Sequence, residues 1–467
     1  MTEATAGAAA PVRAARAPRR TPFELSFTLE ERTVGSHAGG EPDWLTADRR
    51  AAYQRYQALP VEANQLYTTY VDLRAADLSA VLPWESPATR PDATATTSNL
   101  PADVAGIASF VEDRIDALLL DDTSRAAGVA LESLAGLIER DESLARRLIG
   151  DDRSLPLDDK LAQLTRAGWN QGVVLHVPAG VRIERPIVLR WRAGEAGRAL
   201  LTRTILDLGE GATVSVVEEL EGSPGAGGRD EPQALFTGTL EVHLATGATL
   251  EVASIQDFAA GTVAFQHRQA EIGEGATLNW ALAQLGGRLV RSRVDNRLSG
   301  NRSSVEQVEI VFGAEDQLFD LTSFTRHIGR DTTGNLLSKG ALMDASRSYM
   351  KGLIIIEPTA VGTDSFLGEF GMNLSKGARS VAIPSLEIDQ PDCRRAMHSS
   401  SVGPVDEGQL FYLESRGIPP DEARKFIVLG FLEPVVARVP LEAAREDLRE
   451  LLEAKWDAGT QVAAPAA

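Results

Sequence analysis

The chain has 467 residues, which exceeds the size at which a single compact core usually divides, so two or three domains are expected. Hydrophobic residues make up 43% and charged residues 24% of the sequence, a mixture typical of globular proteins. The formal net charge of −19 gives the protein no overall attraction for phosphate groups, which excludes nucleic acid and anionic membranes as expected partners.

The N-terminal residues predict a tail without stable structure. Residues 1–22 are rich in Ala, Arg and Pro and lack the apolar segment of a secretory signal, and we expect residues 1–40 to be disordered. An Arg-rich start also occurs in organelle transit peptides, and this alternative stays open. No run of about 18 apolar residues is present, so no transmembrane helix is expected. The single cysteine, Cys393, excludes an internal disulfide framework and favours the cytoplasm.

Helical patterns dominate residues 41–168, which we interpret as an N-terminal helical domain. Residues 101–118 carry apolar side chains at steps of three and four, the spacing of one helix face. Thr46 is placed to cap a helix that runs to Leu59, and the following proline would end it. Residues 84–99 are rich in Pro, Ser and Thr and predict a linker.

From residue 169 onward the apolar period changes from 3.6 to 2, the period of β-strands. A Gly-Ala-Thr turn precedes several short strands, at Gly211-Ala212-Thr213, Gly247-Ala248-Thr249 and Gly275-Ala276-Thr277. Glycine supplies backbone angles that other residues resist, and recurrence at such intervals suggests stacked β units. We therefore predict a mainly β protein with a β-solenoid core over residues 169–402; a sandwich or barrel is the alternative.

Residues 403–467 return to helical patterns and are interpreted as a C-terminal helical domain. Asp406 with Gln409 resembles a capping box for a helix that Gly417 would end. The next helix begins near Pro419, and a charged helix follows over residues 440–456. The apolar stripe expected on the middle helix consists of Ala423, Phe426, Ile427, Gly430 and Phe431.

Signatures of catalysis are missing from the sequence. There is no phosphate-binding G-x-x-x-x-G-K-[ST] loop, no G-x-S-x-G elbow and no H-E-x-x-H helix. The histidines show no metal-ligand spacing, and each is interpreted as a surface or satisfied core residue: His37, His176, His243, His267, His327 and His398. Residues 392–398 are the exception, because Cys393 and His398 lie close together where the β pattern meets the C-terminal helices. An incidental cysteine in a junction loop is the alternative interpretation.

Several stretches, in the same order along the chain, resemble the SufB/SufD family of iron–sulfur cluster assembly proteins. They are residues 172–181 (GVVLHVPAGV), 383–388 (IPSLEI), 409–418 (QLFYLESRGI), 421–424 (DEAR) and 430–435 (GFLEPV). The resemblance covers roughly residues 128–439, and its C-terminal signature is the most specific part. It implies a right-handed parallel β-helix between N-terminal and C-terminal helical domains.

Within the family, the chain resembles SufD more than SufB. Iron–sulfur clusters are held by several thiolates, which one cysteine cannot supply. SufB carries a functional cysteine at the position that is Glu369 in this chain. His398 and the residues after it resemble the SufD pattern of His, three small residues, Val and Gly, whereas SufB tends to carry Glu where Ser399 stands. Many SufD chains have a cysteine two residues before this histidine, but Ala396 is there instead. Whether the displaced Cys393 replaces that cysteine stays open.

The resemblance implies a non-catalytic scaffold that pairs edge to edge with SufB and docks the ATPase SufC. It implies only an indirect relation to the sulfur donor system, because sulfur is delivered to SufB. It implies no intrinsic cofactor and no metal held stably by the isolated chain, but a nascent iron–sulfur cluster near the SufB interface, where His398 and Cys393 are the candidate residues. Whether reduced flavin associates with the assembled complex stays open. The residues that the resemblance assigns to SufC contact are Gln409, Leu410, Phe411, Tyr412, Arg416, Gly417 and Phe431.

Two other functions remain as alternatives at this point. A polysaccharide-processing β-helix enzyme would present clustered carboxylates on adjacent coils, an arrangement that sequence cannot reveal. A purely structural adaptor would share the fold but have no role in cluster formation.

Overall fold

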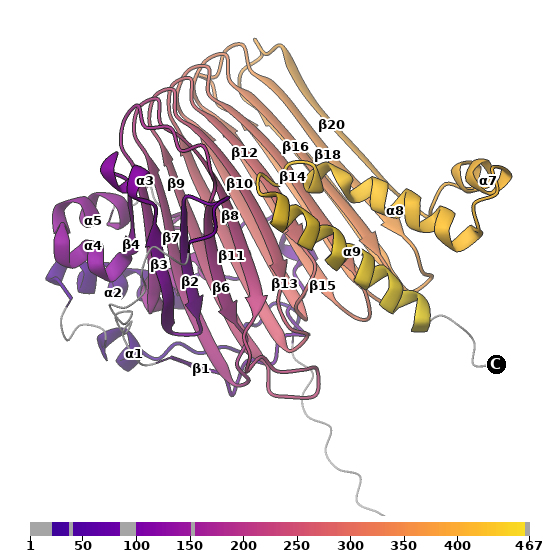
Figure 1. The fold of residues 1–467 in the computed structure, drawn as a ribbon, viewed down its shortest axis with the longest axis horizontal. Coiled ribbons are helices and arrows are strands. Elements are labelled where there is room, and N and C mark those ends of the chain that lie inside the picture. The colour runs from indigo at the N-terminus through magenta and orange to yellow at the C-terminus, as the bar shows by residue number, and fades with distance from the viewer. Residues whose placement is uncertain (1–20, 37–40, 85–99, 151–154, 463–467) are drawn as a thin grey trace, which may run out of the picture.

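The computed structural model describes residues 21–36, 41–84, 100–150 and 155–462. Its centre is a parallel β-solenoid, in which successive strands alternate between two facing sheets and helices lie outside them (Figure 1). The prediction of a mainly β protein with a solenoid core is therefore confirmed.

The strands divide between two sheets. Sheet one contains β1 (Leu82–Pro83), β4 (Ala130–Ser133), β5 (Gln171–Val177), β7 (Arg198–Leu208), β9 (Ala234–Leu244), β11 (Thr262–Ile272), β13 (Leu289–Leu298), β15 (Leu318–His327), β17 (Arg347–Ile356) and β19 (Arg379–Ile388). Sheet two contains β2 (Gly106–Val111), β3 (Arg114–Leu120), β6 (Ile187–Ala193), β8 (Thr213–Gly222), β10 (Thr249–Asp257), β12 (Thr277–Gln284), β14 (Ser304–Gly313), β16 (Thr333–Leu342), β18 (Asp364–Asn373) and β20 (Arg395–Gly403).

The helices lie before and after the main run of strands, with α3 to α6 between the first strands. They are α1 (Glu31–Ser36), α2 (Asp43–Ala58), the 3-10 turn η1 (Thr68–Tyr70), α3 (Asp122–Ala126), α4 (Leu134–Arg140), α5 (Glu142–Ile149), α6 (Lys160–Gly168), α7 (Glu407–Ser415), α8 (Pro420–Val436) and α9 (Glu442–Val462). Among the described residues, none of these helices is long and apolar enough to cross a membrane.

Glycine turns at one rim of the solenoid connect sheet one to sheet two. Gly211, Gly247 and Gly275 have φ angles of 64°, 67° and 63°, in the left-handed region that favours glycine. The backbone of each turn also donates a hydrogen bond to the next coil. For example, the N–H of Gly247 donates to the carbonyl of Glu274 at 2.8 Å. The Gly-Ala-Thr repeat in the sequence therefore marks the corners of the coils, as predicted.

The two ends of the solenoid differ. At the N-terminal end the antiparallel pairs β2–β3 and β4–β5 close the sheets. At the other end, within the described chain, β19 pairs only with β17 and β20 only with β18. One edge of each last strand is therefore left without a backbone partner.

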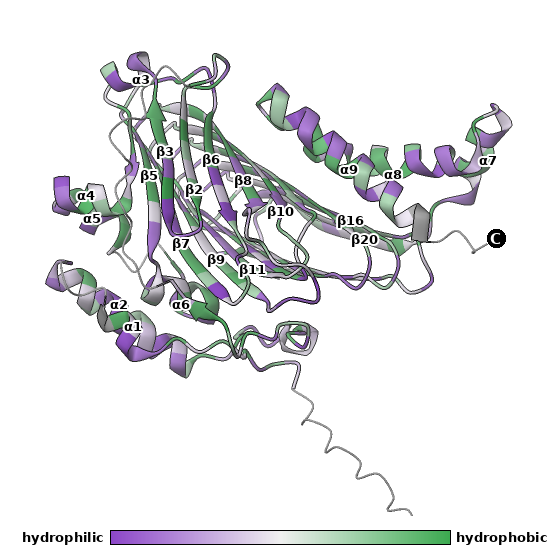
Figure 2. Cartoon of the chain, turned by 60° about the horizontal axis from the view of Figure 1, so that its bottom comes forward, coloured by the Kyte–Doolittle hydropathy of each residue, from purple (hydrophilic) through white to green (hydrophobic). Residues whose placement is uncertain are grey.

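Helices cover the outer faces of both sheets. Helices α1, α2 and α6 lie by sheet one, whereas α8 and α9 lie by sheet two (Figure 2). The buried side chains of α8 include Val428, Leu432 and Val436, which pack against sheet two. The stripe expected from the sequence is correct at Ala423 but wrong at Phe426, which is 60% exposed. The helix is rotated away from that expectation because the outer face of sheet two, rather than a small helical domain, supplies its apolar partner.

The expected N-terminal helical domain, residues 41–168, is less helical than predicted. Residues 101–118 form β2 and most of β3 instead of a helix, because β2 extends sheet two by parallel pairing with β6. A short run of apolar residues is compatible with the period of a helix and with that of a strand, and here the pairing with β6 makes the segment a strand. Helix α2 ends beside Leu59 as predicted but begins at Asp43, so Thr46 is not its cap.

The disorder expected for residues 1–40 does not extend over residues 21–36. Phe27, Leu29 and Val34 are buried in the cluster beside sheet one. Residues 1–20 and 37–40 lie outside the described residues, as does nearly all of the expected linker, at residues 85–99.

Candidate functional site at the open end of the solenoid

His398 lies on β20, at the end of the solenoid where the strands have free edges. Its Nδ1 is 3.1 Å from the carbonyl oxygen of Pro384 on β19. A carbonyl oxygen only accepts hydrogen bonds, so Nδ1 carries the proton and, in the neutral ring, Nε2 carries the lone pair. The residue is exposed, so the imidazole of His398 is accessible at this end.

Cys393 lies in the turn before β20 and has different surroundings. The free thiol is half-buried and packs with Leu386 and Ala396 against a buried cluster that includes Ile354. In this position it behaves as a small apolar side chain. The thiol packs on this apolar cluster, whereas the imidazole of His398 bonds to the carbonyl of Pro384, so the two side chains have different partners. No group of three His, Cys, Asp or Glu side chains suited to a metal ion occurs in the described part of the chain.

Glu369 on β18 is a buried carboxyl group close to the same end. Its side chain is 1% exposed, and Oε2 accepts a hydrogen bond from the backbone N–H of Ile383 at 2.7 Å. Burial raises the pKa of Glu369 to about 8, and the hydrogen bond from Ile383 offsets only part of that rise. Sequence analysis noted Glu369 only as the position where SufB carries a functional cysteine. Alternation along β18 gave no signal that Glu369 points inward, because the opposite face, with Phe366 and Phe370, is the more apolar one.

Most other described histidines have structural partners, as expected from the sequence. His327 is buried, with Nδ1 at 2.7 Å from the hydroxyl of Thr332, and burial lowers its pKa to about 4. His176 lies 2.7 Å from Asp207. His37 lies outside the described residues.

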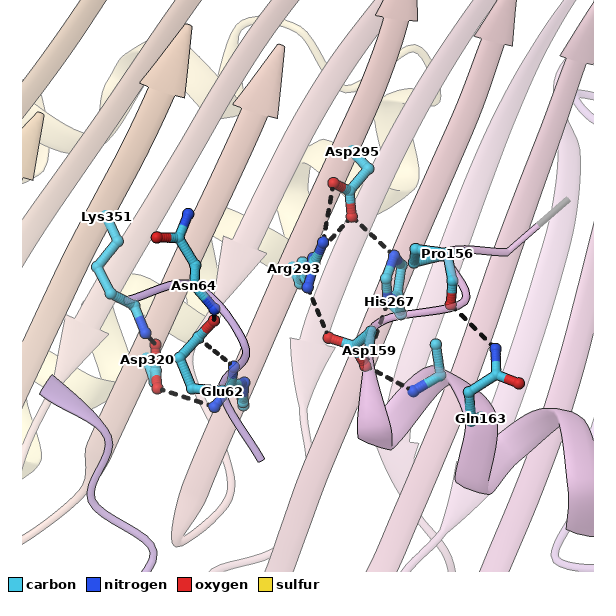
Figure 3. A network of polar contacts seen from close by, with 12 residues as sticks. Glu62, Asn64, Pro156, Asp159, Gln163, His267, Arg293, Asp295, Asp320 and Lys351 are labelled. Carbon is cyan, nitrogen blue, oxygen red and sulfur yellow. Dashed lines mark hydrogen bonds and ion pairs between the residues drawn. The ribbon is translucent and has the colours of Figure 1, made fainter. Parts of the chain in front are cut away.

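A buried ionic network on the outer face of sheet one clasps the N-terminal segment to the solenoid (Figure 3). Asp159 caps α6 and pairs with Arg293 at 2.8 Å, while Arg293 and His267 both contact Asp295, at 2.7 and 2.9 Å. Burial alone would raise the pKa of Asp159, but Arg293 and His267 outweigh it and hold that pKa well below its usual range. The network therefore holds α6 against the solenoid.

A second branch of the clasp ties the loop after α2 to the same face. Glu62 pairs with Arg291 at 2.7 Å, and Asp320 lies between Arg291 and the buried Lys351, at 3.7 and 2.5 Å. Burial lowers the pKa of Lys351. These charges pair with one another, so we interpret this cluster as a structural one.

Comparison with known proteins places this geometry in a family. The family model described as SUF system FeS cluster assembly, SufBD core domain, matches residues 191–431, more than half of the chain. The chain belongs to the SufB/SufD family. The iron–sulfur cluster assembly protein SufD of Bacillus subtilis is 29% identical over 299 residues, which cover 64% of this chain and 67% of that protein. A SufBD family protein of Mycobacterium tuberculosis is 29% identical over 305 residues, 63% of this chain and 74% of the relative. SufB of Bacillus subtilis is 25% identical over 347 residues, 73% and 72% of the two chains.

The residues predicted to contact SufC all lie inside the region that matches the SufBD core. Asp406 caps α7 through the N–H of Gln409 at 2.7 Å, as predicted. Helix α7 buries none of its residues, and Phe411 and Tyr412 are 73% and 58% exposed. The other predicted contact residues are exposed or half-buried: Gln409, Leu410, Arg416, Gly417 and Phe431. Leu410 and Phe431 pack partly against the buried cluster between α8, α9 and sheet two, and the assignment of all seven as contact residues stays a prediction.

Proposed function

We propose that this SufB/SufD family chain is a SufD-like scaffold subunit of a cytoplasmic iron–sulfur cluster assembly complex and catalyses no reaction of its own. The observation that carries the proposal is the open end of the solenoid, where β19 and β20 each have an edge without a partner. The presence of only one cysteine, Cys393, favours a SufD-like over a SufB-like role, because clusters are held by several thiolates. It also suits a reducing compartment.

The open end is the surface that we assign to a SufB-like partner. Unpaired strand edges are templates for pairing with another chain, and proteins usually cover or blunt them. Here the side chains of β20 are almost all exposed, including Met397 at 53% and Val402 at 41%. A partner solenoid that continued both sheets would supply the missing backbone hydrogen bonds and bury these apolar groups.

Helices α7 and α8 are the surface that we assign to a SufC-like ATPase. Exposed aromatic side chains are favoured anchors of protein interfaces, and three of them gather here: Phe411, Tyr412 and Phe426. A groove of about 760 Å³ runs between the last strands and these helices, and Phe426 and Phe431 line it. A groove beside exposed aromatic rings suits a helical element of a partner.

We propose that the iron–sulfur cluster is cargo formed with the SufB-like partner, and that His398 is the group contributed by this chain. Its accessible imidazole is able to move protons or donate a lone pair. Cys393 packs on the apolar cluster that includes Ile354, and we propose no necessary role for it.

Co-purification with the SufB-like and SufC-like proteins of the same organism tests the assembly. Met397→Lys places a charge on the proposed edge and should reduce recovery of the SufB-like protein. Leu82→Lys is the matched control, because Leu82 is 59% exposed but lies on β1, which pairs with β7 toward the other end of the solenoid. Equal recovery with both variants would refute pairing through this end.

A further inference from the structure

Two side chains from sheet two converge on one dipeptide of sheet one. Glu369 of β18 accepts the backbone N–H of Ile383 at 2.7 Å, and Nδ1 of His398 on β20 donates to the carbonyl of Pro384 at 3.1 Å. Because Ile383 and Pro384 are consecutive, the two contacts hold the same short piece of β19.

Strand register explains why both side chains point to this dipeptide. In the β18–β20 ladder, His398 lies beside Leu367, and Ser400 lies beside Glu369. Side chains in register share a face, and Leu367 faces the buried interior. With a strand spacing of about 4.8 Å and a two-residue rise of about 6.6 Å, the Cα atoms of Glu369 and His398 are about 8 Å apart. The side chains of Glu369 and His398 therefore extend next to each other from sheet two toward sheet one.

The opposite strands are adapted to receive the carboxyl group. Pro384 has no N–H for the ladder with β17, and its register partner is Gly352. A Cβ atom on Gly352 would lie 2.8 Å from Oε1 of Glu369 and 2.6 Å from the methyl carbons of Leu367. Glycine at this position thus leaves the space that the side chain of Glu369 occupies.

We propose that Glu369 is a positioning residue for His398. By holding Ile383 and Pro384, it fixes the carbonyl that selects the Nδ1–H tautomer of the imidazole and leaves the lone pair on Nε2. The tautomer follows from these contacts alone, whereas its consequence for cluster assembly rests on the proposed function.

The carboxyl group performs this role without a charge at neutral pH. Within the described residues Glu369 forms no ion pair, and burial raises its pKa to about 8. Only an acceptor oxygen is needed to bind the N–H of Ile383, and an amide oxygen is also an acceptor. Glutamine at position 369 is therefore expected to preserve the arrangement, and leucine to fill the space without accepting the hydrogen bond.

Nitrogen NMR of the full chain labelled with ¹⁵N-histidine measures the tautomer directly. His398→Gln identifies the ring signals, which should show Nδ1–H as the major form in the wild type and in Glu369→Gln. In Glu369→Leu, Nδ1–H should cease to be the major form, because an exposed neutral imidazole in water favours the Nε2–H tautomer. Glu309→Leu is the matched control: Glu309 is equally buried, but it lies on β14, away from the last coil.

Each outcome decides the proposal. A folded Glu369→Leu protein that keeps Nδ1–H as its major form would overturn it. Should that variant not fold, Glu369→Gln decides: retention of Nδ1–H supports positioning through the acceptor, and its loss refutes it. Cluster reconstitution separates this result from the proposed function, since full cluster yield from His398→Ala would refute the role of His398 and leave the tautomer measurement standing.

Discussion

Replacing Glu369 with glutamine should stabilise the folded chain at alkaline pH and change it little at acidic pH. Burial raises the pKa of this carboxyl from its model-compound value of 4.5 to about 8 in the folded chain. An acid whose folded pKa is raised holds its proton more tightly in the folded state than in the unfolded state. Its contribution to stability is therefore fully present below about pH 4.5 and is lost as the pH rises through about 8.

The magnitude follows from the same two values. A difference of about 3.5 pH units corresponds to about 5 kcal/mol of unfolding free energy, at about 1.36 kcal/mol for each unit. This is an upper limit, because local relaxation and water entry reduce the cost of ionising a buried carboxyl. Glutamine keeps the hydrogen bond from Ile383 and cannot ionise, so it escapes this loss.

Urea unfolding of wild type and Glu369→Gln at about pH 5.5 and about pH 9 measures the effect. Groups common to both proteins cancel when the difference between the two proteins is compared at the two pH values. Glu407→Gln, at the exposed start of α7, is the control and should show no such dependence. A stability difference between Glu369→Gln and wild type that is the same at both pH values would refute the reasoning.

The remaining predictions concern assembly, the site and the clasp. His398→Ala should let the complex form but lower cluster yield in anaerobic reconstitution, whereas Cys393→Ser should match wild type; failure of Cys393→Ser alone would show that the thiol has a role. Phe411→Asp on the exposed helix α7 should reduce co-purification with the SufC-like protein while the β-rich circular dichroism persists, and undiminished binding would contradict the docking assignment. The isolated chain should neither hydrolyse ATP nor show a durable cluster spectrum, since it has no phosphate loop and one thiol. Arg293→Met should lower the unfolding free energy by about 3 to 5 kcal/mol, because it removes the guanidinium that two buried carboxylates, Asp159 and Asp295, share and leaves them with the imidazole of His267; a loss under about 1 kcal/mol would contradict the clasp.

The solenoid could be predicted from the sequence because the turns at its corners require particular residues close together in the chain. Gly247 and its equivalents need a backbone angle that glycine tolerates, and strands such as β10 begin with alternating polar and apolar residues. The C-terminal helices were equally readable, since the cap at Asp406 is a contact between near neighbours in the chain. Such local patterns involve few residues and can be recognised without knowing which strands pair.

The predictions that failed concern contacts between residues that are distant in sequence. Residues 101–118 became strands because β6, far along the chain, offers them an edge. The face of α8 was misplaced because its orientation depends on Val308 and Ile310 of sheet two. The convergence of Glu369 and His398 on β19 was hidden for the same reason, since only the stacking of the last coils makes their partners neighbours.

Glu369 is also a poor choice for stability alone. A buried carboxyl with only one hydrogen bond costs free energy that an apolar side chain beside Leu367 would not. Accommodating it uses two further residues unsuited to strand interiors, Gly352 and Pro384. Such departures from local rules are expected where a structure serves function, and these lie in the last coils, next to the edge that a partner would cover. The cost is therefore understandable if the three residues maintain His398 in one tautomer at the open end of the solenoid.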